Sequence, residues 1–209
     1  MLPAIPGSVY QRLVVGYHGC DRRVAERVLL SGEHLKKSRN RYDWLGEGIY
    51  SWEYGHRRAR EFAEWKARRG EIAEPDVIGA YLYLGRCFDL ADTWATSELA
   101  AIHQRLVSDL GIAREPVPEN RPAGKGDFDR VLRDLDCAVI NAAVARFDLG
   151  VGPGSEVQTV RGVFVEGEAP YAGAGFRTKT HVQIAVRDLG CILGYFRPPA
   201  TYTPPQEHP

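Results

Sequence analysis

The first seventy residues show short apolar runs separated by amphipathic stretches. Residues 13–17 (LVVGY) form an apolar run typical of a buried strand. The pattern that follows predicts a helix over 21–31. Asp21 can cap its start and Gly32 can end it. A second strand is expected at 49–52 and a second helix at 55–69, with alanines and a phenylalanine on its inner face. The segment therefore reads as two strand–helix pairs.

The middle of the chain predicts one buried strand and two helices. Residues 77–84 (VIGAYLYL) are apolar in both alternating sets, which indicates a strand buried on both faces, and 87–90 should continue the sheet after a turn. Leucines and an isoleucine at helical spacing predict a helix over 94–110. Apolar positions within 128–135 mark another helix, and 137–140 reads as a short apolar segment after it.

Three strands are expected near the carboxyl end, at 157–165, 178–186 and 191–196. Strands and helices follow one another without a regular βαβ rhythm. We therefore expect an α+β fold with a mainly antiparallel sheet.

Length and composition suit one domain. The 209 residues are 44% hydrophobic, and we expect a single domain over 1–209 with a helical and loop insertion at about 92–150 and a proline-rich tail at 198–209. Net charge is zero, so the whole chain gives no bulk signal for nucleic acid or membrane. However, residues 1–70 carry fourteen Lys/Arg against eight Asp/Glu, which leaves this third at about +6. Such a region either attracts phosphate or is only a solvated basic face.

Four cysteines are widely spaced and form no C-x-x-C pair. This argues against a structural zinc site and favours buried thiols in a reducing compartment. The chain lacks a signal-like start and any apolar stretch near ~20 residues. The expected location is the cytoplasm, without a membrane partner and without a metal.

Two short motifs carry the chemistry. The first is Tyr17-His18-Gly19-Cys20, and the second is Leu45-Gly46-Glu47-Gly48-Ile49-Tyr50 about thirty residues later. Late in the chain, the alternation over 178–186 places His181 and Gln183 on the face opposite Val182 and Ile184. A histidine after an apolar strand is also often a core residue bonded to the backbone, and a tyrosine after Gly-x-Gly-Ile is often core packing.

Together these segments resemble the ADP-ribosyltransferase superfamily, in its His-Tyr-acid branch of diphtheria-toxin-like and poly(ADP-ribose) polymerase-like enzymes. The resemblance is specific over about forty residues and general elsewhere. It implies a split antiparallel sheet with NAD, as substrate, in a cleft between its halves.

Site roles also come from this resemblance. It implies that His18 donates to a ribose hydroxyl of NAD and that the main chain of Gly19 grips the nicotinamide amide. Tyr50 should stack on nicotinamide, and either Tyr42 or Tyr17 should add aromatic contact. Further cofactor contacts are expected from Gly48 and His181.

The chain departs from the family pattern at the third position. No Glu lies on the strand where the family places its catalytic acid, and Gln183 is the closest fit. A neutral amide can accept a hydrogen bond from the ribose 2′-hydroxyl but adds no negative charge. Glu166 is the first candidate for a substitute acid, followed by Glu47 and Glu53.

The expected activity is mono-ADP-ribosylation of a macromolecular acceptor (protein, RNA or DNA), in a toxin or phage-defence setting, with a neutralising antitoxin protein as a partner. Two alternatives stay open on the same fold: an NAD glycohydrolase or RNA 2′-phosphotransferase-like enzyme, and an inactive nucleotide-binding module. Four basic residues before Tyr50 are candidates to contact NAD phosphates or an acceptor nucleic acid: Lys36, Lys37, Arg39 and Arg41.

Overall fold

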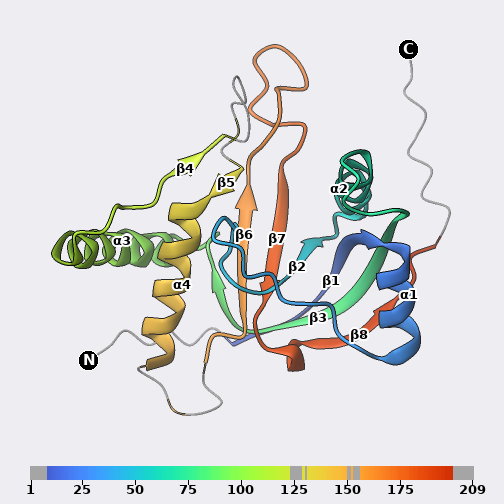
Figure 1. Ribbon diagram of the computed structural model, residues 1–209, viewed down its shortest axis with the longest axis horizontal. Coiled ribbons are helices and arrows are strands. Elements are labelled where there is room, and N and C mark those ends of the chain that lie inside the picture. The colour runs from blue at the N-terminus through green and yellow to red at the C-terminus, as the bar shows by residue number, and fades with distance from the viewer. Residues whose placement is uncertain (1–8, 123–128, 130, 150–151, 153–155, 200–209) are drawn as a thin grey trace.

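The computed structural model describes residues 9–122, 129, 131–149, 152 and 156–199 (Figure 1). The main elements follow the order strand, helix, strand, helix, strand, two helices around a small hairpin, and three strands. They are β1 (Val9–Asp21), α1 (Arg22–Ser31), β2 (Ile49–Glu53), α2 (His56–Arg68), β3 (Pro75–Asp89), α3 (Thr93–Ala113), β4 (Asn120–Arg121), β5 (Leu132–Arg133), α4 (Asp134–Leu149), β6 (Thr159–Phe164), β7 (His181–Val186) and β8 (Ile192–Phe196).

Six of the strands form one sheet in the order β1-β2-β7-β6-β3-β8. Because β1 also pairs with β3, the first five of these strands close into a ring. Pairing within this sheet is antiparallel except between β3 and β6, which run parallel. The expectation of an α+β fold with a mainly antiparallel sheet is confirmed.

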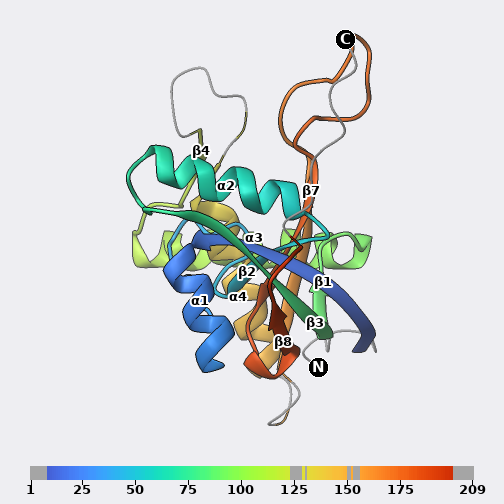
Figure 2. The same cartoon turned by 90° about the vertical axis from the view of Figure 1, so that its right-hand side faces the viewer.

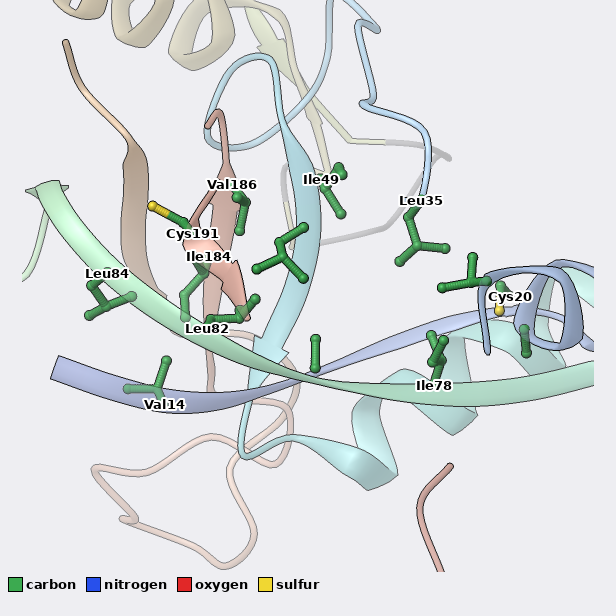
Figure 3. Close-up of a cluster of buried hydrophobic side chains, with 14 of the residues drawn as sticks. Val14, Cys20, Leu35, Ile49, Ile78, Leu82, Leu84, Ile184, Val186 and Cys191 are labelled. Carbon is green, nitrogen blue, oxygen red and sulfur yellow. The ribbon is translucent and has the colours of Figure 1, made fainter. Parts of the chain in front are cut away.

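The interior of the ring is the first hydrophobic core. Figure 3 shows Val14 and Leu82 on one side of this space and Ile49, Ile184 and Val186 on the other. All five side chains are at most 2% exposed. Burial of this apolar surface holds the two halves of the sheet together.

Helices α2, α3 and α4 pack on the outer face of the sheet, whereas α1 contributes Ala25 and Val28 to the first core (Figures 1 and 2). A second core lies between α3, α4 and the outer face of β6 and β7, where Phe88, Phe147 and Phe164 pack. A third, smaller core lies under α2 and contains Trp52 and Ala59. The face of the sheet opposite the first core is therefore also buried.

The first two helices agree with the sequence. The Asp21 carboxylate accepts a hydrogen bond from the Arg23 N–H at 3.0 Å, and Gly32 ends α1 with φ of 72°. Both are features of the expected caps. The helix expected at 94–110 is present as α3, and the one expected at 55–69 is present as α2.

Two other expectations were wrong. No turn separates 77–84 from 87–90, because β3 runs without interruption through Gly85, whose φ of 58° bends the strand while Arg86 bonds to Gln158. The apolar segment at 137–140 is not separate from a preceding helix but lies inside α4, which begins only at Asp134. Its continuous apolar run is typical of a helix buried on several sides.

The four cysteines are buried and free, as expected. No helix in the described part of the chain combines the length and apolar character needed to cross a bilayer. The prediction of a tail at 198–209 falls mostly on residues outside those that the structure describes.

Candidate functional site

The candidate site begins where β1 and β2 part. The two strands pair at Gly16 with Glu53 and at Tyr17 with Trp52, and their ladder ends there. β1 continues along β3 as far as Asp21. The two motifs of the sequence analysis therefore meet at a fork in the sheet.

Hydrogen-bond alternation shows which way the main chain of Gly19 faces. The Tyr54 N–H donates to the Val15 carbonyl on the β2 side, and the Arg22 N–H donates to the Glu74 carbonyl on the β3 side. Because neighbouring residues of an antiparallel strand point their polar groups to opposite edges, Gly19 points its N–H and C=O toward β2. No strand in the described ranges pairs with Gly19 on that side.

His18 occupies the fork. Its Nδ1 lies 2.7 Å from the Tyr50 carbonyl oxygen, and because a carbonyl only accepts, Nδ1 carries the proton. Burial lowers the pKa of His18 below its ordinary value, so the ring is neutral and Nε2 is an acceptor. The implied direction of its bond to ribose is thus reversed: His18 can accept a hydrogen bond from a ribose hydroxyl but cannot donate one.

Gly19 also has a structural reason to be glycine. A Cβ at this position would lie 2.1 Å from the Ala59 carbonyl oxygen of α2. The helix therefore packs directly on the strand at Gly19.

Tyr50 is held by its hydroxyl group. This oxygen accepts a hydrogen bond from the Leu45 N–H and donates one to the Gly46 carbonyl, both at 2.7 Å. Burial raises the pKa of the Tyr50 phenol. Its ring packs against the second core, so the ring and hydroxyl of Tyr50 have a structural role. The group of Tyr50 that bonds to His18 is its main-chain carbonyl.

Gln183 lies beside this fork on the other face of the sheet. It pairs directly with Trp52, so their side chains project from the same face. Tyr17 also pairs with Trp52, and His18 therefore projects from the opposite face. Gln183 is only 9% exposed. The face of the sheet that carries it is therefore buried at this point, and its polar groups are not open to solvent.

Glu166 and His181 come together at the adjoining ends of β6 and β7. The Glu166 carboxylate is 3.7 Å from His181 Nδ1 and 3.8 Å from the Arg58 guanidinium of α2. Both separations exceed hydrogen-bond distance. Desolvation raises the pKa of the Glu166 carboxyl group, and it lowers the pKa of His181 to about 4.

Several polar atoms of this cluster have no hydrogen-bond partner. His181 Nδ1 donates to the Lys179 carbonyl at 2.7 Å, which leaves Nε2 as a buried acceptor without a donor. The buried Trp52 Nε1 and Arg58 Nε atoms are likewise unsatisfied donors. Buried polar groups normally find partners, so this set marks a place where a polar ligand would gain hydrogen bonds.

Aromatic rings line the same region. The Trp44 and Phe164 ring centroids are 4.8 Å apart, and the Arg133 guanidinium stacks 4.4 Å and 4.9 Å from these rings. Trp52 packs 5.1 Å from Phe62 on its other side. We call Glu166, His181, Arg58, Trp52 and Gln183 the acid–imidazole cluster.

Other sequence candidates lie elsewhere or have structural partners. Tyr42 is exposed on a turn, and Gly48 packs closely on Ala185, where a Cβ would lie 2.9 Å from the Ala185 Cβ. Glu47 pairs with Arg39, and Glu53 forms a buried ion pair with Arg161.

The sequence did not indicate Arg58, Trp52 or Arg133 as site residues. Trp52 was detectable, because strand alternation from Tyr50 puts it on the same face two residues later. Arg58 and Arg133 had no such signal, since tertiary packing alone brings them to Glu166 and Phe164. The described part of the chain holds no group of three or more metal-ligating side chains.

Comparison of the chain with protein-family models, curated proteins and solved structures finds no match.

Proposed function

We propose that this chain is a mono-ADP-ribosyltransferase that transfers ADP-ribose from NAD to a macromolecular acceptor. The observation that carries the proposal is the fork. There, the main chain of Gly19 faces the β2 edge without a strand partner, and the neighbouring His18 imidazole bonds to the Tyr50 carbonyl. An amide such as that of nicotinamide needs one carbonyl and one N–H, which is what an unpaired strand residue offers.

The acid–imidazole cluster supports the same proposal from the other face. In this proposal NAD enters the fork between β1 and β2 next to His18, and Gln183 pairs with Trp52 at the same end of the fork. The Gln183 amide would accept a hydrogen bond from the ribose 2′-hydroxyl group. Glu166, which is 5% exposed and lies beside His181, supplies a carboxylate.

The proposed reaction breaks the bond between C1′ of the nicotinamide ribose and the ring nitrogen. Nicotinamide leaves with the bonding electron pair, and the acceptor's nucleophile forms a new bond to C1′. The proton of the nucleophile passes to Glu166 in its ionised form. Because residue 183 is a neutral glutamine rather than an acid, the cationic ribose receives less stabilisation, and we expect slow turnover.

The test is incubation with adenylate-labelled NAD and fractionated cell extract, with nicotinamide release measured in parallel. His18→Ala and Gln183→Ala should each lower label transfer at least tenfold, while His34→Ala, a change at an exposed histidine, should not. Each variant is first checked for wild-type circular dichroism. Equal transfer by wild type and His18→Ala would overturn the proposal.

A nucleotide-binding module is the second candidate. It is favoured by two observations: Gln183 is neutral, and the Tyr50 hydroxyl is already engaged by Leu45 and Gly46. This alternative predicts saturable NAD binding in calorimetry without release of nicotinamide. Release of nicotinamide without a labelled acceptor would instead indicate an NAD glycohydrolase.

A further inference from the structure

A long hairpin projects from the sheet next to the acid–imidazole cluster. Residues 165–180 join β6 to β7 and extend beyond the rest of the sheet in both views, on the side of the molecule where α2 lies (Figures 1 and 2). Its base closes where the Lys179 N–H donates to the Glu166 carbonyl at 3.0 Å. The hairpin therefore rises directly from the residue proposed to accept the proton.

This hairpin exposes two aromatic rings. Tyr171 is 62% exposed and Phe176 is 75% exposed. Large exposed aromatic side chains on a projecting loop are available to a partner rather than to the core. Arg177 and Lys179 stand on the same hairpin, together with one exposed carboxylate, Glu168.

The neighbouring helix is strongly basic. α2 carries five Lys/Arg and two Asp/Glu. Arg57 in its first turn has a side chain that is 64% exposed, and Trp65 further along is 43% exposed. Arg57 and Arg58 both pair with Glu61, and Arg58 also lies 3.8 Å from Glu166, so Arg57 is the more exposed positive charge of the first turn.

The helix and the hairpin meet at the cluster. Arg58 Nη2 of α2 lies 3.8 Å from the Glu166 carboxylate at the hairpin base. The first turn of α2 therefore lies beside the base of the hairpin, and we call the basic and aromatic residues of these two segments the basic–aromatic surface. It is defined by Arg57, Arg58, Tyr171, Phe176, Arg177 and Lys179.

We infer that the basic–aromatic surface binds single-stranded nucleic acid and that the acceptor is therefore RNA or DNA. The identity of the acceptor rests on the proposed function, whereas the binding of single strands does not. Cationic side chains attract the phosphate backbone, and exposed aromatic rings stack on unpaired bases. A duplex, whose bases are already stacked, offers no faces to Tyr171 and Phe176.

A strand held on this surface delivers one nucleotide to the acid–imidazole cluster. The unsatisfied donors of Trp52 and Arg58 can bond to base carbonyl or ring-nitrogen acceptors, and His181 Nε2 can accept from a base N–H. The nucleophilic atom of that nucleotide would bond to C1′ and lose its proton to Glu166.

Binding is measured by fluorescence anisotropy with a labelled 15-nucleotide RNA and DNA of mixed sequence, without NAD. We expect the single strands to bind at least tenfold tighter than the matching duplex at low salt. The double variant Tyr171→Ala/Phe176→Ala should weaken single-strand binding tenfold or more, because it removes both rings on which bases would stack. No binding of either single strand at low salt would overturn the inference.

Charge is tested separately. The double variant Arg57→Glu/Arg177→Glu should weaken the salt dependence of binding. The negative slope of log K against log salt concentration should become smaller in magnitude by about 1.4, which is ~0.7 per lost phosphate contact. The matched control is Arg23→Glu/Arg105→Glu, which changes the same net charge at exposed positions on α1 and α3. Equal loss of affinity in both pairs would show bulk electrostatics rather than this surface, and would contradict the inference.

Two failures are distinguishable. If single strands bind but nicotinamide is never released, the reaction fails and the binding surface stands. If nicotinamide is released and label appears only on protein, with transfer unaffected by Tyr171→Ala/Phe176→Ala, the proposed function stands and the nucleic-acid inference is wrong.

Discussion

Gly19 shows how one residue can have both a structural and a chemical reason for its identity. Its main chain faces the fork, and its missing side chain lets α2 approach. The sequence motif alone suggested the first role, as part of the resemblance. It gave no indication of the second, because contact with Ala59 depends on the packing of a helix forty residues away.

Replacing Gly19 by alanine should destabilise the protein. The new Cβ would lie 2.1 Å from a backbone oxygen, so α2 has to move. We expect a loss of about 1–3 kcal/mol or more in the free energy of unfolding, measured by urea denaturation. Gly111→Ala is the control, because no atom lies within 4 Å of its Cβ inside α3. The control should be neutral or slightly stabilising. Equal stabilities for the two variants would show that the helix packs more loosely than the structure indicates.

Tyr50→Phe tests the other half of the fork. Removing the hydroxyl leaves the Leu45 N–H and the Gly46 carbonyl without their partner. We expect a loss of about 1–3 kcal/mol in unfolding free energy, again from urea denaturation. Because the Tyr50 main chain still faces His18, the proposed label transfer by the folded variant should fall less than in His18→Ala. A Tyr50→Phe variant as stable as wild type would show that water replaces the hydroxyl.

Among the elements, β2, β3 and β6 are joined by a buried ion network. Arg161 of β6 lies 2.5 Å from Glu53 of β2 and 3.1 Å from Asp89 of β3, and the three side chains are 5–12% exposed. Glu53 was a minor candidate for the catalytic acid. Its carboxylate instead neutralises Arg161, and this pairing was not predictable, because Arg161 lies 108 residues away along the chain.

Arg161→Met should therefore be strongly destabilising. It leaves two carboxylates buried without their cation, and breaking a buried pair from one side costs about 3–5 kcal/mol. Chemical denaturation measures this loss, with Arg105→Met on the exposed surface of α3 as control. The triple variant Arg161→Met/Glu53→Gln/Asp89→Asn should recover part of the stability. Failure of the triple variant to recover any stability would indicate that packing, rather than charge, holds these strands together.

Elements with strong local signals were predictable, and those shaped by tertiary contacts were not. Asp21 and Gly32 bound α1 as expected, since capping is decided within one turn. The sequence predicts a turn between 84 and 87, within β3, because Gly85 and Arg86 resemble one. The strand continues because its last residues find a new partner in β6, which no local pattern shows.

At the scale of the whole molecule, the candidate site joins segments from both ends of the chain. Strand alternation predicts that His181 and Gln183 share one face, and Glu166 is the candidate substitute acid near the end of the preceding strand. The sequence did not show that this face is buried, since α2 and α4 cover it only after folding. The unsatisfied atoms of Trp52 and Arg58 arise from the same long-range packing.

The buried histidines should make the protein sensitive to acid. His181 has an ordinary pKa of 6.5 when unfolded and about 4 when folded, so the unfolded state binds more protons between these values. Stability is therefore fully present above pH 6.5 and is lost as the pH falls toward 4. The gap corresponds to at most about 3 kcal/mol. His18 acts in the same direction, because burial also lowers its pKa.

Glu166 affects the pH dependence of stability in the opposite direction. Its pKa is raised in the folded state, so its contribution is present below about 4.5 and is lost as the pH rises. Urea denaturation at pH 7.5 and pH 4.5 separates the two effects. His181→Gln should shrink the loss of stability between these pH values, whereas Glu166→Gln should raise stability at pH 7.5. An unchanged pH dependence in His181→Gln would mean that folding does not lower the pKa of His181, which would contradict the desolvated environment of this imidazole.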